Sequence, residues 1–215
     1  MHMGRFDTID KWVRSSHLGH TLNLGSKATQ WGDVRVDVNR PGRPTVVADC
    51  RALPFKAAKF DTVLFTDVIE HLPKDGENAA LGEIARVLRL PGRLLLTTPN
   101  DRFFLRFLDP AWWLFGHRHY ARERLLQLLA MAAFEPESVR TIGDPIRDTL
   151  ALLLLTSSPS VSRLFEWASR LLGDQKPDEY RYNDSGFTHF IVARLRPDRK
   201  HPESVAVGDF LPDRR

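Results

Sequence analysis

Cysteine is scarce in this sequence, because Cys50 stands alone among 215 residues. A single cysteine forms no internal disulfide and cannot by itself build a structural zinc site, which favours a reducing compartment. The opening residues, MHMGRFDTIDKWVRSS, lack the apolar stretch of a secretory signal. A long hydrophobic run is also missing: the uncharged stretch 149–162 has fourteen residues, includes Pro159 and is too short to span a bilayer. We therefore expect a cytoplasmic protein.

Concentrated basic charge is missing as well. The formal net charge of +4 comes largely from arginines scattered along the chain, without lysine blocks or interleaved aromatic and basic residues. No nucleic-acid partner is expected. With 42% hydrophobic and 27% charged residues, the composition is that of a globular chain with one well-filled core.

Strand-like and helix-like patterns alternate along the chain. This alternation favours an α/β fold with a mostly parallel, doubly wound sheet and a ligand crevice beyond the carboxyl ends of the strands. Expected strands are 21–24, 34–38, 45–48, 62–66, 93–98, 138–142 and 187–195, and expected helices lie near 6–13, 80–88 and 125–132. The segment Leu-Pro-Gly at 90–92 is expected to end the second helix. We expect one domain over 1–195 with a helical apolar insertion at about 145–178, and a mobile polar tail over 196–215.

Two aspartates stand at successive strand ends. Asp37 ends the second expected strand, where a carboxylate can accept hydrogen bonds from two ribose hydroxyls. Asp49 follows the third expected strand, where a carboxylate can accept a hydrogen bond from the exocyclic amine of adenine. Leu53 follows closely in the sequence and could cover the adenine ring. Taken alone, either aspartate is better explained as a turn or helix-capping residue. Their joint placement favours a site for an adenosine-containing cofactor.

The order of motifs over 48–100 points to a family. The runs ADCRALPFKAAKFDTVLFTDVIEHL and LGEIARVLRLPGRLLLTTPN resemble the class I S-adenosylmethionine-dependent methyltransferases, in particular the methyltransferase type 11 group. The resemblance implies a Rossmann-like sheet with an antiparallel last strand, S-adenosylmethionine as cofactor and a small-molecule acceptor. It implies cofactor-side positions at Gly25, Ser26, Lys27, Asp37, Asp49, Cys50, Leu53, Asp67 and Glu70.

The first loop departs from this family's acid-x-Gly-x-Gly-x-Gly pattern. The chain has Asn23 in place of the acid, keeps Gly25, and continues with Ser26, Lys27 and Ala28. Twelve residues separate Gly25 from Asp37 and twelve separate Asp37 from Asp49, so neither connection has room for a three-turn helix and its loops. Shortened first crossovers are predicted. Lys27 either approaches the methionine carboxylate of the cofactor or is an exposed loop lysine.

Methyl transfer from a sulfonium needs alignment and, for some acceptors, a base. The sequence offers His119 and His71 as catalytic candidates, and we favour His119 because its segment is expected to face the substrate side. Asn100, His117 and Tyr120 lie near the same mouth, and each candidate has a purely structural explanation. His117 and His119 form a pair without a convincing third ligand, so no metal site is expected.

Two apolar segments bear on the acceptor. The aromatic-rich segment 102–116 and the leucine-rich segment 150–173 are consistent either with added core packing or with a lipophilic pocket that makes peripheral contact with a membrane. The sequence therefore predicts a methyltransferase for a small, lipophilic acceptor. The alternative is a degenerate, non-catalytic relative that serves as an interaction partner. The oligomeric state is left open.

Overall fold

The structure is a computed structural model and describes residues 5–15, 18–27, 29–101, 118–142 and 188–197. Its elements follow one another as α1 (Arg5–Ser15), β1 (Thr21–Leu24), β2 (Val34–Asp37), β3 (Val46–Val47), β4 (Phe60–Thr66), the 3₁₀ turn η1 (Ile69–His71), α2 (Gly76–Val87), β5 (Leu88–Pro99), α5 (Arg122–Met131), β6 (Phe134–Ile142) and β7 (Thr188–Leu195).

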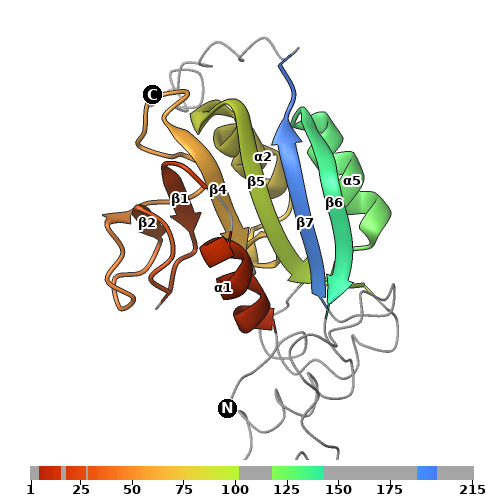
Figure 1. The fold of residues 1–215 in the computed structure, drawn as a ribbon, viewed down its shortest axis with the longest axis horizontal. Helices are drawn as coiled ribbons and strands as arrows, with labels where there is room; N and C mark the ends of the chain where they lie inside the picture. The colour runs from red at the N-terminus through yellow and green to blue at the C-terminus, as the bar shows by residue number, and fades with distance from the viewer. Residues whose placement is uncertain (1–4, 16–17, 28, 102–117, 143–187, 198–215) are drawn as a thin grey trace, which may run out of the picture.

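The seven strands form one sheet in the order β3-β2-β1-β4-β5-β7-β6 (Figure 1). The pairs from β3 to β5 are parallel, and β7 runs antiparallel to both of its neighbours, β5 and β6. The predicted fold class, a mostly parallel sheet with an antiparallel last strand, is confirmed.

Helices cover the two faces of the sheet (Figure 1). On one face Ile9 of α1 packs against Leu64 of β4, Leu95 of β5 and Phe190 of β7. On the other face α2 and α5 bury their apolar stripes against the larger part of the core. In the central strands β4 and β5, the side chains on both faces of the sheet are mostly buried. This burial explains why the two strands are nearly continuous apolar runs.

The connections from β1 to β2 and from β2 to β3 are short, as the spacing of Gly25, Asp37 and Asp49 in the sequence predicted. No helix occurs among the described residues between β1 and β2 or between β2 and β3. The helices that would cover β1, β2 and β3 in a fully doubly wound sheet are therefore missing from this part of the described chain, and the cofactor-side loops must hold themselves in place by other contacts.

The start of β5 differs most from its prediction. The helix α2 ends at Val87 and β5 begins at once with Leu88, so the Leu-Pro-Gly segment lies inside the strand and is not what ends the helix. Leu88 pairs with Phe60, and the ladder shifts register before Thr62 pairs with Arg93. The irregular register lets the strand accommodate Pro91, which has no N–H to donate.

Two of the sequence motifs contact each other. Glu83 and Arg86 of α2 are ion-paired at 2.7 Å. Glu83 accepts the backbone N–H of Leu53 at 2.7 Å, and Arg86 donates to the carbonyls of Leu53 at 3.0 Å and of Phe55 at 2.7 Å. The Glu-x-x-Arg motif of α2 thus binds the backbone of the Leu-Pro-Phe motif and fixes the loop after β3.

Several predictions fall outside the described residues. These are the insertion at 145–178, the tail beyond residue 197, the apolar segments 102–116 and 150–173, and His117. Within the described part of the chain, no helix is both long enough and apolar enough to cross a membrane.

Candidate active site

The carboxyl ends of β1, β2, β4 and β5 bring most of the predicted residues to one edge of the sheet. Gly25 follows β1, Asp37 ends β2, Asp67 follows β4, and Asn100 follows β5. Because parallel strands end at the same edge, their loops converge there, as the sequence predicted for the cofactor side.

Gly25 is retained because no side chain fits at its position. Its φ of +69° lies in the left-handed region, and a Cβ there would collide with Cγ2 of Val68, which follows β4. Its N–H donates to the carbonyl of Val36 at 2.8 Å. The first loop therefore lies close to the ends of both β2 and β4.

The residue that replaces the family's acid serves the loop itself. The side-chain amide of Asn23 donates to Thr29 at 3.0 Å and to the carbonyl of Trp31 at 3.2 Å, and Thr29 in turn donates to the carbonyl of Ser26. Ser26 is buried, and its hydroxyl has no hydrogen-bond partner in the described chain. Its hydroxyl is thus a buried polar group in the first loop whose hydrogen-bonding capacity is unused.

Asp37 links the two shortened connections. One carboxylate oxygen accepts the backbone N–H of Lys27 at 2.9 Å and the other accepts that of Asn39 at 2.9 Å. The residue is buried, and each of its oxygens has a further lone pair for an incoming hydroxyl. The side chain of Lys27 is exposed. Above this loop, Gly42 packs so closely on the carbonyl of Lys27 that a Cβ would not fit.

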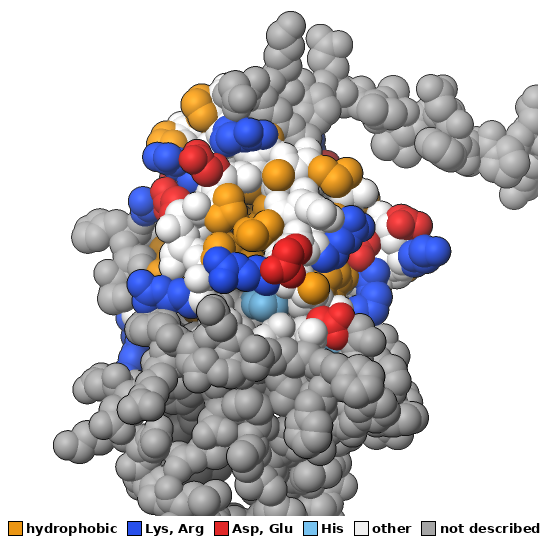
Figure 2. Space-filling view, turned by 90° about the vertical axis from the view of Figure 1, so that its right-hand side faces the viewer, with side chains coloured by type: hydrophobic (Ala, Val, Ile, Leu, Met, Phe, Trp, Pro, Cys, Tyr) orange, Lys and Arg blue, Asp and Glu red, His pale blue; other side chains and the backbone are white. Residues whose placement is uncertain are grey.

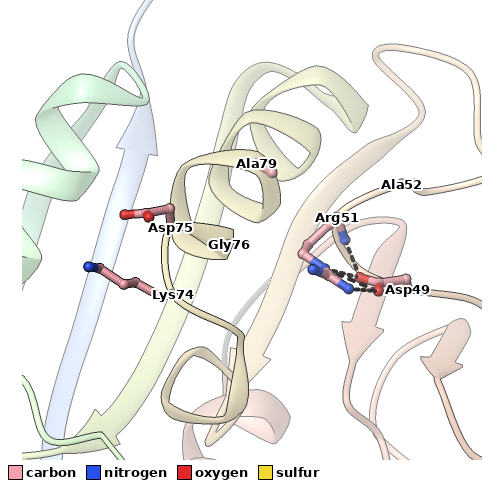
Figure 3. Close-up of a pocket in the computed structure, with 7 residues that line it drawn as sticks. All are labelled: Asp49, Arg51, Ala52, Lys74, Asp75, Gly76 and Ala79. Carbon is pink, nitrogen blue, oxygen red and sulfur yellow. Dashed lines mark hydrogen bonds and ion pairs between the residues drawn. The ribbon is translucent and has the colours of Figure 1, made fainter. Parts of the chain in front are cut away.

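Asp49 is engaged by a residue that the sequence reasoning did not consider. Arg51 forms an ion pair with it at 2.6 Å, and both side chains are more than a third exposed. The hydrogen bonds from Arg51 hold the pKa of Asp49 below its usual value despite partial burial. Figure 3 shows the guanidinium of Arg51 folded against the carboxylate of Asp49. Both residues line a cavity of about 390 Å³ at the start of α2.

The neighbours of Asp49 have buried, structural side chains. Burial raises the pKa of Cys50 to about 11, so its thiol stays protonated at neutral pH and is a poor nucleophile. Leu53 is buried in the main core cluster.

Two buried acids follow β4, and successive threonines of β5 donate to them. Thr97 donates to Asp67 at 3.1 Å and Thr98 donates to Glu70 at 3.1 Å. Both acids are at least nine-tenths buried. The paired threonines of the TTPN motif therefore fix the two carboxylates that the resemblance places beside the methyl-bearing end of the cofactor.

The segment 118–120 holds the turn that carries Glu70 and His71. Arg118 donates to Glu77 of α2 at 2.5 Å and to the carbonyl of Leu72 at 2.5 Å, and its backbone N–H donates to the carbonyl of Glu70 at 3.4 Å. The hydroxyl of Tyr120 donates to the carbonyl of Ile69 at 3.1 Å and lies 3.0 Å from Glu77. Burial raises the pKa of Tyr120, which keeps its hydroxyl protonated.

The structure places the two candidate bases differently. His119 lies between Arg118 and Tyr120, next to the bridge that joins Tyr120 to Asn100, and its Nδ1 is buried. His71 is exposed at the end of η1. The segment of His119 thus adjoins both the β4 and the β5 ends of the site.

Sequence reasoning missed Arg51, Glu77, Arg118 and His189. Burial lowers the pKa of His189, whose neutral ring donates from Nε2 to the carbonyl of Tyr120 at 3.0 Å. Arg118 belongs to the segment 117–120 (His-Arg-His-Tyr, HRHY), of which the sequence analysis considered only the histidines and Tyr120. The sequence around Glu77 and His189 does not indicate their roles, because their partners lie far away in the sequence. Arg51 was missed because its partner, Asp49, had been assigned to the adenine of the cofactor.

The residues at the strand ends fit the cofactor that the resemblance implies. Asp37 retains acceptor capacity for the ribose hydroxyls that the resemblance implies, the Ser26 hydroxyl is unsatisfied in the described chain, and the acids Asp67 and Glu70 lie after β4, where the resemblance places the methyl-bearing end of the cofactor. Asp49 is the exception, because its carboxylate is occupied by Arg51. Among the residues that the structure describes, no three histidines, cysteines or acids are grouped as metal ligands.

The face that carries α5 and β6 mixes its charges. In the coloured part of Figure 2, lysines and arginines alternate with acids around small hydrophobic groups. On this described part of the surface no continuous basic stripe of the kind that tracks nucleic acid is seen.

Comparisons with known proteins agree with this architecture. Residues 23–96, about a third of the chain and including the altered first loop, match the family model described as a methyltransferase domain. None of the curated proteins compared matches the sequence.

Solved structures share the fold at low sequence identity. A methyltransferase from Thermotoga maritima, described as S-adenosylmethionine-dependent and as a possible histamine N-methyltransferase, is 16% identical with a TM-score of 0.58, over 89% of this chain and 96% of that one. The 1,6-didemethyltoxoflavin-N1-methyltransferase of Burkholderia thailandensis, solved with S-adenosylhomocysteine, is 14% identical with a TM-score of 0.54, over 89% and 77%. The [4+2]-cyclase SpnF is 17% identical with a TM-score of 0.60, over 88% and 78%.

The cyclase shows that this fold alone does not fix the reaction. The family match covers β1 to β4 and most of β5, and it includes the positions from Gly25 to Glu70 that the resemblance assigns to the cofactor side. Residues 23–96 therefore belong to a methyltransferase domain of the type 11 group, and S-adenosylmethionine is the methyl donor of that family.

Proposed function

We propose that the chain transfers the methyl group of S-adenosylmethionine to a small molecule with an apolar part. The observation that carries the cofactor side is the set of buried acids at neighbouring strand ends, Asp37 after β2 and Asp67 and Glu70 after β4. The apolar part of the acceptor rests on the sequence of 102–116 and 150–173, which is rich in aromatic residues and leucine and lies outside the described residues.

In this proposal the cofactor supplies an activated methyl group, and the protein supplies alignment and proton removal. Asp37 accepts hydrogen bonds from the ribose hydroxyls with the lone pairs that its two backbone donors leave free. Asp67 and Glu70 favour the positive sulfonium, because opposite charges attract strongly where water is excluded. Ser26 donates its unsatisfied hydroxyl to the cofactor.

His119 is the proposed base for acceptors that lose a proton. Its neighbours Arg118 and Tyr120 are both fixed to the turn after β4, which limits the movement of its backbone relative to Glu70. His71, which is exposed, is the alternative base.

Cofactor binding is tested by titrating the purified chain with S-adenosylhomocysteine in a calorimeter. The wild type should bind, and Asp37→Ala should lose about 1 to 3 kcal/mol of binding free energy, the value of charge-assisted hydrogen bonds. Glu135→Ala, which removes an exposed acid on β6, is the matched control and should bind like the wild type. An affinity unchanged by Asp37→Ala would contradict the ribose assignment, and no binding by the wild type would favour the non-catalytic alternative.

The nature of the acceptor is tested with a labelled methyl group. The chain is incubated with methyl-labelled S-adenosylmethionine and a cell extract, and the products are partitioned between organic solvent and water. Label should enter the organic phase, and His119→Gln should reduce this label while leaving S-adenosylhomocysteine affinity unchanged. Label confined to the aqueous phase would contradict the apolar acceptor.

A further inference from the structure

Arg51 takes up most of the hydrogen-bonding capacity of Asp49. The backbone N–H of Arg51 donates to Oδ1 at 2.8 Å, and its Nε lies 3.0 Å from Oδ1 and 3.1 Å from Oδ2. Its second terminal nitrogen donates to Oδ2 at 2.6 Å. A carboxylate offers about four lone-pair positions, and three N–H groups of this one arginine point at them, with the Nε–H shared between both oxygens. An adenine amine that approaches Asp49 must therefore compete with the guanidinium for the carboxylate oxygens.

The position of Arg51 is set by the start of α2. A Cβ on Gly76 would lie 3.3 Å from Cδ of Arg51, so the arginine stem lies in close contact with the first residue of the helix. Figure 3 shows the side chains of Lys74 and Asp75 pointing away from the Asp49–Arg51 pair, so neither competes with it. The open cavity beside the pair is lined by Lys74 and Asp75 and by three small residues, Ala52, Gly76 and Ala79.

The ion pair can open at a small cost. The side chains of Arg51 and Asp49 are 40% and 37% exposed, and ion pairs with that exposure contribute little to stability because water replaces them readily. Arg51 is therefore a displaceable competitor for the carboxylate, and not a fixed wall of the site.

We propose that Arg51 determines how strongly the site selects for the adenine amine, by competing with it for the carboxylate of Asp49. This inference rests on the proposed function, because it assumes that the adenosine end of the cofactor binds beside Asp49. With Arg51 present, a ligand that carries a carbonyl in place of the amine should bind nearly as well as the adenine ligand. Without Arg51, the free carboxylate should favour the amine and repel the carbonyl.

The test compares S-adenosylhomocysteine with S-inosylhomocysteine, in which a carbonyl replaces the amine, by calorimetry on the full chain. The measured quantity is the ratio of the two affinities, which cancels every contribution from the ribose and the amino-acid end. Arg51→Ala should raise this ratio about two- to fivefold or more, the size expected from releasing an exposed ion pair. Arg51→Lys keeps the charge but not the planar guanidinium, so its affinity ratio should lie between those of the wild type and Arg51→Ala.

Two variants complete the design. Arg93→Ala breaks another arginine–acid pair, with Glu137, on the sheet and should leave the ratio as in the wild type. Asp49→Ala combined with Arg51→Ala should abolish the gain, because the carboxylate is gone. An unchanged ratio in Arg51→Ala, while S-adenosylhomocysteine still binds, would overturn this inference alone. No binding of either ligand by any variant would overturn the proposed function and this inference with it.

Discussion

The contact between Arg118 and Glu77 joins the HRHY segment to α2, and its removal should destabilise the whole domain. The carboxylate of Glu77 is 8% exposed and receives the guanidinium at 2.5 Å, while the Arg118 side chain is 31% exposed. The same guanidinium also donates to the carbonyl of Leu72 at 2.5 Å. Arg118→Ala thus leaves a buried charge without its counter-ion and a carbonyl without its donor.

The magnitude follows from these contacts. Breaking a fully buried ion pair costs about 3 to 5 kcal/mol. Because nearly a third of the Arg118 side chain is exposed, water can enter the vacated space and solvate Glu77 in part, which lowers our expectation to about 2 to 3 kcal/mol. Arg118→Lys keeps the charge but cannot reach the carboxylate and the carbonyl with one planar group, so it should cost about 1 to 2 kcal/mol.

A double-mutant cycle separates this interaction from general damage. Glu77→Gln removes the buried charge, so Arg118→Ala should cost less in that background, with a coupling free energy of at least about 1 kcal/mol. The measurement is urea unfolding followed by circular dichroism at pH 7. Arg14→Ala, which breaks the exposed pair with Asp10 on α1, is the control and should leave stability nearly unchanged. Additive effects of Arg118→Ala and Glu77→Gln would refute the reasoning.

Two further predictions concern the first loop and the contact of Glu83 and Arg86 with the loop after β3. Gly25→Ala should abolish S-adenosylhomocysteine binding in calorimetry and lower the melting temperature, because its left-handed φ and the contact with Val68 leave no room for a methyl group; wild-type behaviour would contradict the loop geometry. Burial tends to raise the pKa of Glu83, but the donors Arg86 and Leu53 outweigh it and lower the pKa below 4.5, so its stabilisation exists above that pH and disappears as the pH falls through the lowered value. The difference in melting temperature between wild type and Glu83→Gln should therefore shrink as the pH falls below 4.5, and a difference that stays constant on acidification would refute the assignment.

Much of the architecture is determined by local sequence. The apolar runs of the strands and the helical spacing in α2 and α5 depend on residues close in the chain, and each was placed within a few residues. The shortened first connections followed from chain length alone, because twelve residues cannot hold a strand end, two loops and three helical turns. Asp37 was recognised from its place at a strand end, since strand ends converge at one edge, whereas Asp67 and Glu70 were assigned through the family resemblance.

The partners of those acids were decided by the tertiary structure. Thr97 and Thr98 meet Asp67 and Glu70 because β5 lies beside β4, and Arg118 reaches Glu77 across 41 residues of sequence. No local periodicity encodes such pairings, because they depend on the order of the strands and on the side chains that happen to face each other. Asp49 illustrates the same limit at short range: its place at a strand end was evident from the sequence, whereas the guanidinium of Arg51 against it depended on the turn geometry and on the room that Gly76 leaves for the arginine stem.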